Sequence, residues 1–404
     1  MTLRPAIAAA LFGNFVVACG VLVVPGMLDL MARDLQVSVP KAGTLLTLAA
    51  LTMCVGAPLM AAFTSRADRR WLLVLSLLTV AAGHLACALA PDFTLLLWLR
   101  PLSVLGIAVF TPQVAATLAL LVPAEQRATA VTTAFVGWSL ASVLGMPIGN
   151  LLADAISWRA SFAAIGVLAV VAALIVWRVI PAGLRVAPLS LQSWAQVLGT
   201  GRLRWILLAT MAWCMGNFMV TGYITAALRE GIQASPALQA GLMTLMGVSG
   251  LVGNIAMSRW VASIGGDRGA RVSLGFVFWG LVLWVPALSW LQATWAVAVA
   301  MFVWGLGSFA FVSAQQARLA QSAPHLASAS VALNSSSLYA GQAMGAALGA
   351  SVVAALGYGA LGPGAAVVMG GAFVCSVLAD RWLQAQAVRR PPTSIDHSKV
   401  GDRS

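Results

Sequence analysis

Charged residues are scarce in this chain. Of its 404 residues, 8% are Asp, Glu, Lys or Arg, and only 11 of these are acidic. Apolar residues make up 61%, and the mean hydropathy is +0.93. Soluble domains carry about 25% charged residues. The composition therefore excludes a soluble globular protein and indicates an integral membrane protein.

Histidine is also rare. The three histidines, His84, His325 and His397, are far apart, and no nucleotide-binding glycine loop or metal-ligand spacing accompanies them. An enzyme needs catalytic groups that converge on one site, so the sequence predicts no enzyme, no catalytic residue, no cofactor and no metal. His84 lies inside an apolar run. We interpret it as a hydrogen-bonded packing residue, with a proton relay as the alternative.

Cysteines are few, and they share no close spacing. All five lie within apolar runs, so we interpret them as packed thiols rather than as disulfides or metal ligands. They are Cys19, Cys54, Cys87, Cys214 and Cys375.

Long apolar runs dominate what is present. Twelve stretches are long enough to cross a bilayer, which takes roughly 20 mostly apolar residues per helix. A membrane barrel would instead show alternating segments of ~10 residues. The sequence therefore predicts an all-α integral membrane protein with twelve transmembrane helices. The stretches begin near Ala6, Ala42, Trp71, Phe93, Ala128, Ser161, Trp205, Pro236, Val272, Thr294, Ala327 and Ala365.

The two halves of the chain echo each other. Gly13-Asn14-Phe15 returns 203 residues later as Gly216-Asn217-Phe218. Gly145-Met146-Pro147-Ile148-Gly149 is answered 200 residues later by Gly345-Ala346-Ala347-Leu348-Gly349. Two matches in the same order at nearly one offset predict two six-helix pseudo-repeats, an arrangement typical of transporters with a central cavity.

The predicted domains follow from this repeat. An N-terminal six-helix bundle spans residues 1–180, and a C-terminal six-helix bundle spans residues 204–385. Residues 181–203 form a cytoplasmic linker between them. The polar, proline-containing residues 386–404 are expected to be a disordered cytoplasmic tail.

The net charge of +12 is a topology signal. With the amino terminus in the cytoplasm, only Arg33, Lys41, Arg159 and Arg229 fall on the opposite side and Arg100 falls inside a span, which leaves 18 of the 23 basic residues in the cytoplasm. This positive-inside bias places both termini in the cytoplasm of a multi-pass inner-membrane protein. Because the basic residues are split among short loops, we expect no nucleic-acid partner.

One arginine lies at membrane depth. Arg100 sits about two turns into the fourth span, where a guanidinium costs roughly 2.5–3.5 kcal/mol and needs a partner or a wet cavity. Asp29, at the outer end of the first span, is the carboxylate we set against it, so that the pair could load and release a proton. The alternatives are a snorkelling Arg100 and a solvated helix-end Asp29.

Two loops carry clusters of charges at equivalent places in the halves. The clusters suit a cytoplasmic latch that pairs in one state of a transport cycle, with plain positive-inside anchoring as the alternative. The residues assigned to this gate are Arg66, Asp68, Arg69, Arg70, Asp267 and Arg268.

The fifth span combines small residues with a proline. Gly145 and Gly149 are four residues apart, which lets a neighbouring helix approach closely, and Gly137 lies earlier in the same span. Pro147 bends the helix between them. Trp158-Arg159 follows at the start of the next span.

These residues resemble the major facilitator superfamily, and in particular its twelve-span drug:proton antiporter group in the arabinose-efflux-like branch, over about residues 5 to 385. Gly145, Pro147 and Gly149 stand where that group has its antiporter motif. Arg100 matches the family's arginine in helix four. The resemblance implies a secondary active transporter that exports small solutes by proton antiport and alternating access.

Three departures from the family pattern matter. Ser65 stands in place of the loop aspartate, with Asp68 where a glycine is expected. Asn150 replaces a small residue after the motif. Many relatives carry a carboxylate in the middle of helix one, where this chain has Asn14 in an apolar span that ends at Asp29. The usual proton site is therefore missing.

Polar and aromatic side chains within the spans are the candidates for lining the substrate cavity, since an unbonded polar group in hydrocarbon is costly. Interhelical hydrogen bonding is the alternative. Without an acidic member, the set favours neutral, zwitterionic or anionic cargo. The candidates are Asn14, Gln113, Trp138, Asn217, Tyr223, Asn334, Tyr339 and Gln342.

The sequence thus predicts a monomeric exporter of drug-like, sugar-like or nucleoside-like solutes, with the small-molecule substrate, protons and the lipid bilayer as its partners. A proton-linked importer or a uniporter on the same fold is the near alternative. A membrane receptor or scaffold is the alternative from another class.

Overall fold

The computed structural model describes residues 3–64, 66–123, 127–185, 191–323 and 326–389. Within these ranges every regular element is helical, and twelve helices are long and apolar enough to cross a membrane. The predicted all-α, twelve-span fold is therefore confirmed. Residues 386–389 of the predicted tail belong to the last helix, and the rest of that tail lies outside the described residues.

The N-terminal half contains six spans. The second is preceded by a short turn of helix, and the fifth is broken in the middle. The elements are α1 (Leu3–Asp34), α2 (Val39–Ala42), α3 (Thr44–Phe63), α4 (Arg69–Ala88), α5 (Phe93–Leu121), α6 (Arg127–Leu140), η2 (Ala141–Gly145), α7 (Met146–Ala155) and α8 (Trp158–Val179).

The C-terminal half repeats this pattern after a linker helix, α9. Its elements are α9 (Leu191–Gly199), α10 (Gly201–Thr221), α11 (Ile224–Ile232), α12 (Pro236–Ile264), α13 (Gly266–Pro286), η3 (Ala287–Leu291), α14 (Thr294–Ser322), α15 (Ala327–Leu356), η5 (Tyr358–Ala360) and α16 (Leu361–Arg389).

Short polar residues set where several helices begin. Side-chain oxygens of Asp68, Asp92, Ser157 and Ser235 accept hydrogen bonds from the first free backbone N–H groups of α4, α5, α8 and α12. These caps replace water for donors that the helix itself cannot satisfy. The caps therefore mark the loop positions that separate consecutive apolar runs.

The fifth span is interrupted by a π-helical segment. η2 ends at Gly145, immediately before α7. Pro147 has no backbone N–H to donate to the preceding turn, so the regular ladder is interrupted there. The predicted bend of this span is therefore explained by a wider turn next to the proline.

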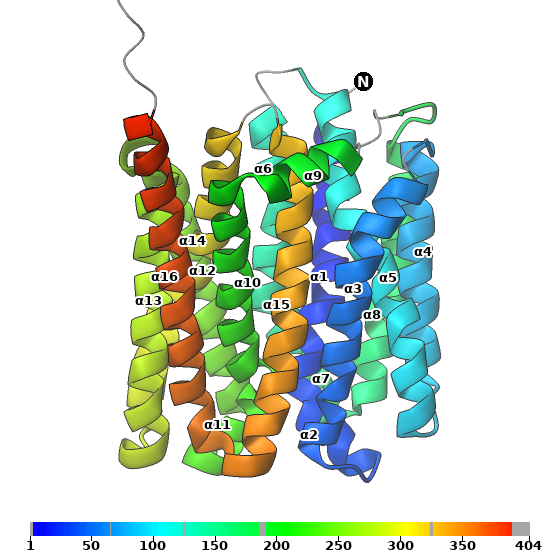
Figure 1. Ribbon diagram of the computed structural model, residues 1–404. Helices are drawn as coiled ribbons and strands as arrows, with labels where there is room; N and C mark the ends of the chain where they lie inside the picture. The colour runs from blue at the N-terminus through cyan, green and yellow to red at the C-terminus, as the bar shows by residue number, and fades with distance from the viewer. Residues whose placement is uncertain (1–2, 65, 124–126, 186–190, 324–325, 390–404) are drawn as a thin grey trace, which may run out of the picture.

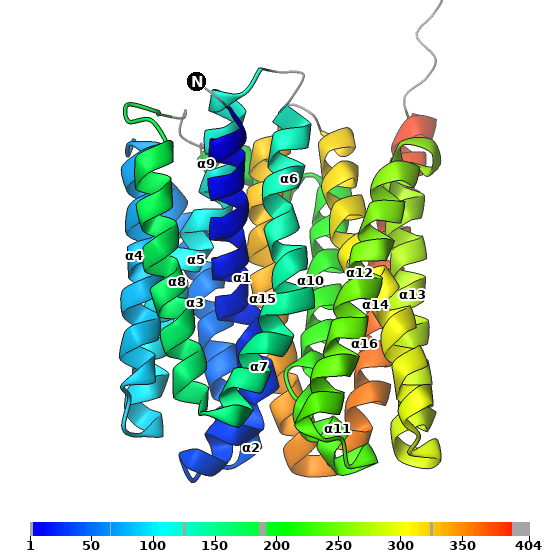
Figure 2. The same ribbon diagram turned by 180° about the vertical axis from the view of Figure 1, so that it is seen from behind.

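The spans run side by side between two ends of the molecule (Figure 1). The first residues of α1 and the last residues of α16 lie at the same end, which we call the terminal end; α2 and α11 lie at the opposite, far end (Figures 1 and 2). α9 lies across the terminal end and packs on α10 and α15 (Figure 1).

The buried core differs between the two ends. One apolar cluster contains residues of both halves, including Leu28, Leu46 and Tyr223 near the far end. A second cluster consists of residues of the N-terminal half, with Tyr339 as its one packed neighbour from the other half. A third contains residues of α9 and the C-terminal half, such as Val197. The N-terminal residues of the shared cluster thus come from the far-end parts of their spans, although its C-terminal residues extend to the terminal end, and α3 and α15 also pack against each other across the halves.

Candidate functional site

The three glycines of the fifth span face α1. A Cβ atom on Gly137, Gly145 or Gly149 would collide with α1, so each glycine marks a position where the two helices approach closely. The groups they meet are, in order, the Leu11 carbonyl, the Cys19 sulfur and the Val23 side chain. Pro147 is buried in the same span. The predicted motif residues therefore form one seam inside the N-terminal half.

A matching seam lies in the C-terminal half, between α15 and α10. Gly341, Gly345 and Gly349 each abut a backbone carbonyl of α10. The carbonyls belong to Met211, Met215 and Met219. The sequence repeat is therefore also a structural repeat: the fifth span packs against the first, and the eleventh span packs against the seventh.

The fifth span also meets the opposite half. A Cβ atom on Gly247 of α12 would lie 2.9 Å from the carbonyl oxygen of Ser142, inside the π-helical segment. Directly after the glycine motif, Asn150 donates from Nδ2 to the Met243 sulfur, at 3.2 Å. Asn150 fits because its neighbour on α1 is Gly26. The residue that departs from the family pattern is therefore a contact between the halves.

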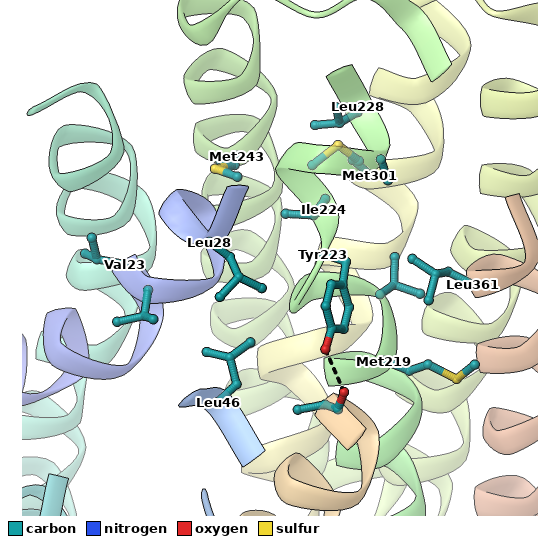
Figure 3. Packing of buried hydrophobic residues seen from close by; sticks show 14 of the residues in the cluster. Val23, Leu28, Leu46, Met219, Tyr223, Ile224, Leu228, Met243, Met301 and Leu361 are labelled. Carbon is teal, nitrogen blue, oxygen red and sulfur yellow. Dashed lines mark hydrogen bonds between the residues drawn. The ribbon is translucent and has the colours of Figure 1, made fainter. Parts of the chain in front are cut away.

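Apolar side chains seal the far end (Figure 3). Leu28 and Leu46 from the N-terminal half belong to the same core cluster as Tyr223 and Ile224. The Tyr223 hydroxyl donates to the Ala346 carbonyl oxygen at 2.8 Å (Figure 3). Tyr223, predicted to line the cavity, is fully buried in this seal.

Asp29 lies at the edge of the seal. Its carboxylate is 2.7 Å from the Arg229 guanidinium of α11, in the opposite half, and 3.3 Å from Arg33 on its own helix. The expected pairing of Asp29 with Arg100 is not formed, because Arg100 lies inside the N-terminal half with partners of its own. Asp29 is 8% exposed, so its pair with Arg229 is largely shielded from water.

A second acid on α1 is tied within its own half. Asp34 accepts a hydrogen bond from Trp158 Nε1 at 2.9 Å and forms an ion pair with Arg159. Arg159 also donates to the Ala90 carbonyl oxygen at 3.2 Å. The Trp158-Arg159 pair that follows the antiporter motif thus fixes the end of α1 to α8 and to the loop before α5.

Arg100 is 2% exposed and is held without a carboxylate. Its two terminal nitrogens donate to the Ser103 hydroxyl and to the Gly20 carbonyl oxygen, each at 3.0 Å. The guanidinium lies over the Phe162 ring, 5.6 Å from its centre. A snorkelling side chain would reach water, whereas this one bridges α5, α1 and α8.

Asn14 is fully buried and is satisfied by neighbours of the N-terminal half. It donates to the Ala134 carbonyl oxygen and accepts from the Thr111 hydroxyl, both at 3.0 Å. Its repeat counterpart Asn217 accepts from Trp304 Nε1 at 2.7 Å. Both amides therefore make the interhelical hydrogen bonds of the alternative interpretation.

Asn334 likewise links helices. It accepts from the Thr210 hydroxyl at 2.8 Å, and Gln315 donates to the same hydroxyl oxygen at 2.8 Å. This network joins α10, α14 and α15. Gln342, also among the cavity candidates, is 5% exposed.

The last three cavity candidates, Trp138, Tyr339 and Gln113, are half-buried. Trp138 packs against both the shared core and the N-terminal core, and its Nε1 has no partner within the described chain. Tyr339 of α15 packs against the N-terminal core. Gln113 accepts from Arg69. Trp138 and Tyr339 come from opposite halves and both contact the N-terminal core.

At the terminal end of the N-terminal half, the predicted gate residues are tied locally. Asp68 caps α4 and accepts from the Gly183 N–H after α8. Arg69 is buried, and Arg70 stacks over Trp177 with 5.3 Å between guanidinium and ring centre. Arg66 is exposed. Ser65 lies outside the described residues.

The C-terminal half holds a denser charge network at the same end. Arg318 of α14 is fully buried and bonds to Asp267 and, at 2.7 Å, to Asp380. Arg202 pairs with Asp267 at 2.8 Å, and Arg271 pairs with Asp380. Arg318 was missed at the sequence level because it was counted only as one of the basic residues on the cytoplasmic side. α14 runs 29 residues, far enough to include this position.

The sequence pattern described as the Major Facilitator Superfamily matches residues 10–346. The chain belongs to the major facilitator superfamily. The match begins inside α1 and ends inside α15, so it includes the glycines of the first seam and, in the second seam, Gly341 and Gly345 but not Gly349.

Curated relatives of this superfamily member are transporters. The chain is 30% identical over 347 residues to the inner membrane transport protein YdhP of Escherichia coli K12, covering 85% of this chain and 88% of YdhP. It is 26% identical over 366 residues to a probable sugar efflux transporter of Helicobacter pylori strain G27, covering 89% of each. These relatives confirm the resemblance to the arabinose-efflux-like branch. The protein is therefore a multi-pass inner-membrane transporter and not an enzyme.

Solved structures show the same superfamily fold. The human organic anion transporter MFSD10 superposes with a TM-score of 0.72 at 16% identity, over 93% of this chain and all of that one. A bacterial homologue of the human lysosomal transporter Spinster, in an inward-facing and occupied conformation, superposes with a TM-score of 0.65 at 14% identity, over 96% of this chain and 98% of that one.

Proposed function

We propose that this superfamily member exports small organic solutes across the inner membrane by proton antiport and alternating access. The observation that carries the proposal is the division of the core: one apolar cluster contains residues of both halves, with its N-terminal members from the far-end parts of their spans, and the other two clusters each lie within one half or its linker helix, apart from Tyr339 packed on the N-terminal one. Alternating access needs two halves that can separate at one end while they meet at the other.

The terminal end is assigned to the cytoplasm. Arginines gather there at the ends of α4, α10, α13 and α14, whereas Arg33, Lys41, Arg159 and Arg229 lie toward the far end. Positive residues favour the cytoplasmic side of a bilayer. With this orientation both termini are cytoplasmic, and the conformation is closed to the outside.

The two glycine seams would keep each half rigid during the cycle. Because the seams lie within the halves, the movement falls to the contacts between halves. These include the far-end seal, the Asp29–Arg229 pair, the contact of Gly247 with Ser142, the Asn150–Met243 hydrogen bond and the packing of α3 on α15. Opening to the outside requires that the seal and the ion pair separate. Export follows when cargo that binds from the cytoplasm leaves on the outside.

The charged loops would close the cytoplasmic side in the other state. In the present conformation the described acids Asp68 and Asp267 are bonded within their own halves, while Arg66 and Arg268 are exposed. An outward-open state would bring the two terminal ends together, and exposed cations would then meet acids of the other half. The cytoplasmic gate is thus proposed as a feature of that second state.

The cargo is proposed to be a neutral, zwitterionic or anionic small molecule handled by a monomer. No acid stands among the candidate lining residues, and Trp138 and Tyr339 offer aromatic faces and N–H or O–H donors. The name of the Helicobacter relative points to sugars as a first class to test. Such side chains orient a solute through hydrogen bonds without requiring a positive charge on it.

A uniporter is the second candidate, and one observation favours it. The middle of α1 carries Asn14, whose amide is already bonded to Thr111 and to the Ala134 carbonyl. An amide does not take up a proton near neutral pH, so this position cannot drive antiport. Proton coupling then depends on other residues of the N-terminal half, for which Arg100 and Asp29 are the charged candidates.

The test is substrate-induced proton flux in inside-out vesicles, with L-arabinose, nucleosides, amphenicol antibiotics and cationic dyes as the panel. We expect that addition of at least one neutral or anionic compound causes protons to leave the vesicles. Vesicles with the Arg100→Ala protein at matched expression should show no such proton efflux. Transport of the same compound without proton movement would instead establish the uniporter. Efficient export of a cationic dye would contradict the proposed cargo class.

A further inference from the structure

His84 presents a bare nitrogen in the centre of the N-terminal half. It lies on α4 and is fully buried. Its Nδ1 is 2.9 Å from the Val80 carbonyl oxygen. Because a carbonyl can only accept, Nδ1 carries the hydrogen. In the neutral ring Nε2 then carries a lone pair and no hydrogen, so it can only accept a hydrogen bond. It has no hydrogen-bond partner within the described chain.

Gly20 of α1 lies against this lone pair. A Cβ atom placed on Gly20 would lie 3.0 Å from His84 Nε2, and the Gly20 carbonyl oxygen is within reach of the ring. Two acceptors cannot bond to each other, so the neutral ring leaves Nε2 unsatisfied at a buried site. A proton on Nε2 would supply the missing donor.

The same Gly20 carbonyl oxygen already accepts a hydrogen bond from Arg100. The donor is Nη2 of Arg100, at 3.0 Å. Phe162 of α8 completes the cluster, with its ring centre 5.6 Å from the Arg100 guanidinium carbon and also 5.6 Å from the centre of the His84 ring. The fourth helix at this point, α4, adds the buried thiol of Cys87.

The groups that face His84 therefore include a positive charge but, among the described contacts, no negative charge. α5 contributes the Arg100 cation, α4 contributes Cys87, α1 contributes the Gly20 backbone and α8 contributes the Phe162 ring. The described contacts of this cluster include no carboxylate. A protonated His84 would place a second positive charge beside Arg100 in a buried site, which is strongly unfavourable.

We propose that His84 is the proton-binding residue of the N-terminal half, and that a proton on its Nε2 and the Arg100 guanidinium on Gly20 exclude each other. This inference rests on the proposed antiport. A hydronium ion from the outside gives its proton to the Nε2 lone pair and leaves as water, Nδ1 keeps its hydrogen, and the imidazolium donates from Nε2 to the Gly20 carbonyl oxygen. Arg100 then loses its hold on α1, and it returns when the proton leaves toward the cytoplasm.

The exchange explains how a chain with Asn14 in helix one can still couple to protons. The guanidinium of Arg100 ties α5 to the middle of α1, whereas a protonated His84 would tie α4 to the same residue of α1. Swapping one cation for the other changes which helix holds α1. Since α1 also carries Asp29 at the far-end seal, a change in its position acts directly on the outer contact.

The test begins with the purified full-length protein, because the chain has only three histidines. In a background with His325→Gln and His397→Gln, ¹³C-labelled histidine reports His84 alone. Between about pH 8 and about pH 5, the range in which histidine normally changes charge, we expect the neutral Nδ1–H form to persist. In the Arg100→Gln protein we expect the protonated form to appear within that range.

The matched control is Arg70→Gln, which removes the same charge from the start of α4, outside the cluster. It should leave the His84 signal as in the parent. Identical pH behaviour of the parent and Arg100→Gln proteins would overturn the proposal, as would an equal change in Arg70→Gln. Nuclear magnetic resonance spectra of folded protein in detergent exclude unfolding as the cause.

A transport readout separates this inference from the proposed function. His84→Gln should lose accumulation driven by a pH gradient while it retains exchange of labelled for unlabelled L-arabinose, or of the panel compound found to be carried. Wild-type uphill transport by His84→Gln would contradict the role of His84 and leave the antiport intact. A parent protein that moves cargo without protons would contradict the antiport, whatever the histidine titration shows.

Discussion

Asp29 on α1 and Arg229 on α11 form an ion pair of 2.7 Å across the two halves of the molecule. Five residues further along α1, Asp34 forms its ion pair with Arg159 inside the N-terminal half. One helix thus carries two acids at the same end, each with an arginine partner. Only the first holds the halves together, so the two acids form a matched pair for experiment.

Loss of the Asp29 charge should open the far end. In Asp29→Asn the carboxylate that pairs with Arg229 is gone, and the loss of about 1–2 kcal/mol changes an equilibrium constant by a factor of about 5–30. The equilibrium should shift toward the outward-open state about five- to thirty-fold. The measurement is the rate at which a membrane-impermeant maleimide labels an introduced Leu46→Cys, which lies buried in the seal.

Two further variants sharpen this prediction. Asp34→Asn should leave the labelling rate unchanged, because its ion pair does not cross the halves. The charge swap Asp29→Arg with Arg229→Asp should restore the slow rate of the parent. Equal acceleration by Asp29→Asn and Asp34→Asn would show that any lost acid loosens α1 and that the pair with Arg229 has no special part.

The glycine seam predicts a rescue. Gly145→Ala places a methyl group on the Cys19 sulfur, and overpacking of this kind costs about 1–3 kcal/mol. Cys19→Ala removes the colliding atom, so the double variant should recover most of the lost transport and thermal stability. Gly137→Ala meets the Leu11 carbonyl of the backbone, and no side-chain truncation should relieve it.

A control glycine lies within the same fold. Gly370 of α16 has open space where a methyl group would go, so Gly370→Ala should behave as the parent in both measurements. Transport by well-expressed Gly145→Ala at the parental rate would refute the close-packing argument.

The seams show how far the sequence could lead. Spacing of small residues identified the helix faces that pack closely, because a glycine every four residues has few other uses in a membrane helix. The repeat at 200 residues placed Gly345 and Gly349 at positions equivalent to Gly145 and Gly149. The spacing could not reveal that Asn150 reaches Met243 in the other half, because a contact between distant spans leaves no local pattern.

Arg318 should matter for folding more than any exposed arginine near it. Arg318→Gln leaves Asp267 and Asp380 with one arginine each, and removing one member of a buried ion network costs about 3–5 kcal/mol. We expect a lower yield of folded protein and a thermal midpoint reduced by several degrees in detergent. The control is Arg268→Gln, on the exposed neighbour in the same loop region, for which the midpoint should not move.

The buried charges also show where sequence reasoning stops. Arg100 stood out because it interrupts an apolar run, and the structure places it at depth as expected. Its partner could not be inferred, since the Gly20 carbonyl is a backbone group present at every residue. Asp29 and Arg229 are separated by 200 residues, and at the sequence level Asp29 was set against Arg100 while Arg229 was counted only as a positive charge on the far side. Only the packing of the halves brings them together.

Arg100 should not tolerate lysine. The two terminal nitrogens of the guanidinium reach Ser103 and Gly20 in different directions, and a single ammonium cannot reproduce that fork. Arg100→Lys should therefore lower the transport rate about tenfold or more, and Arg100→Ala should abolish uphill transport while the protein still reaches the membrane. Near-parental transport by the lysine variant would mean that the positive charge alone suffices.

The most direct measurement is uphill movement of a panel compound in proteoliposomes under an imposed pH gradient, with a proton-sensitive dye in the same vesicles. The account predicts that the compound accumulates against its concentration gradient while protons move the opposite way. It also predicts that both movements stop when the pH gradient is collapsed. Equal rates of transport with and without the pH gradient, and no proton movement, would contradict proton antiport and identify a uniporter.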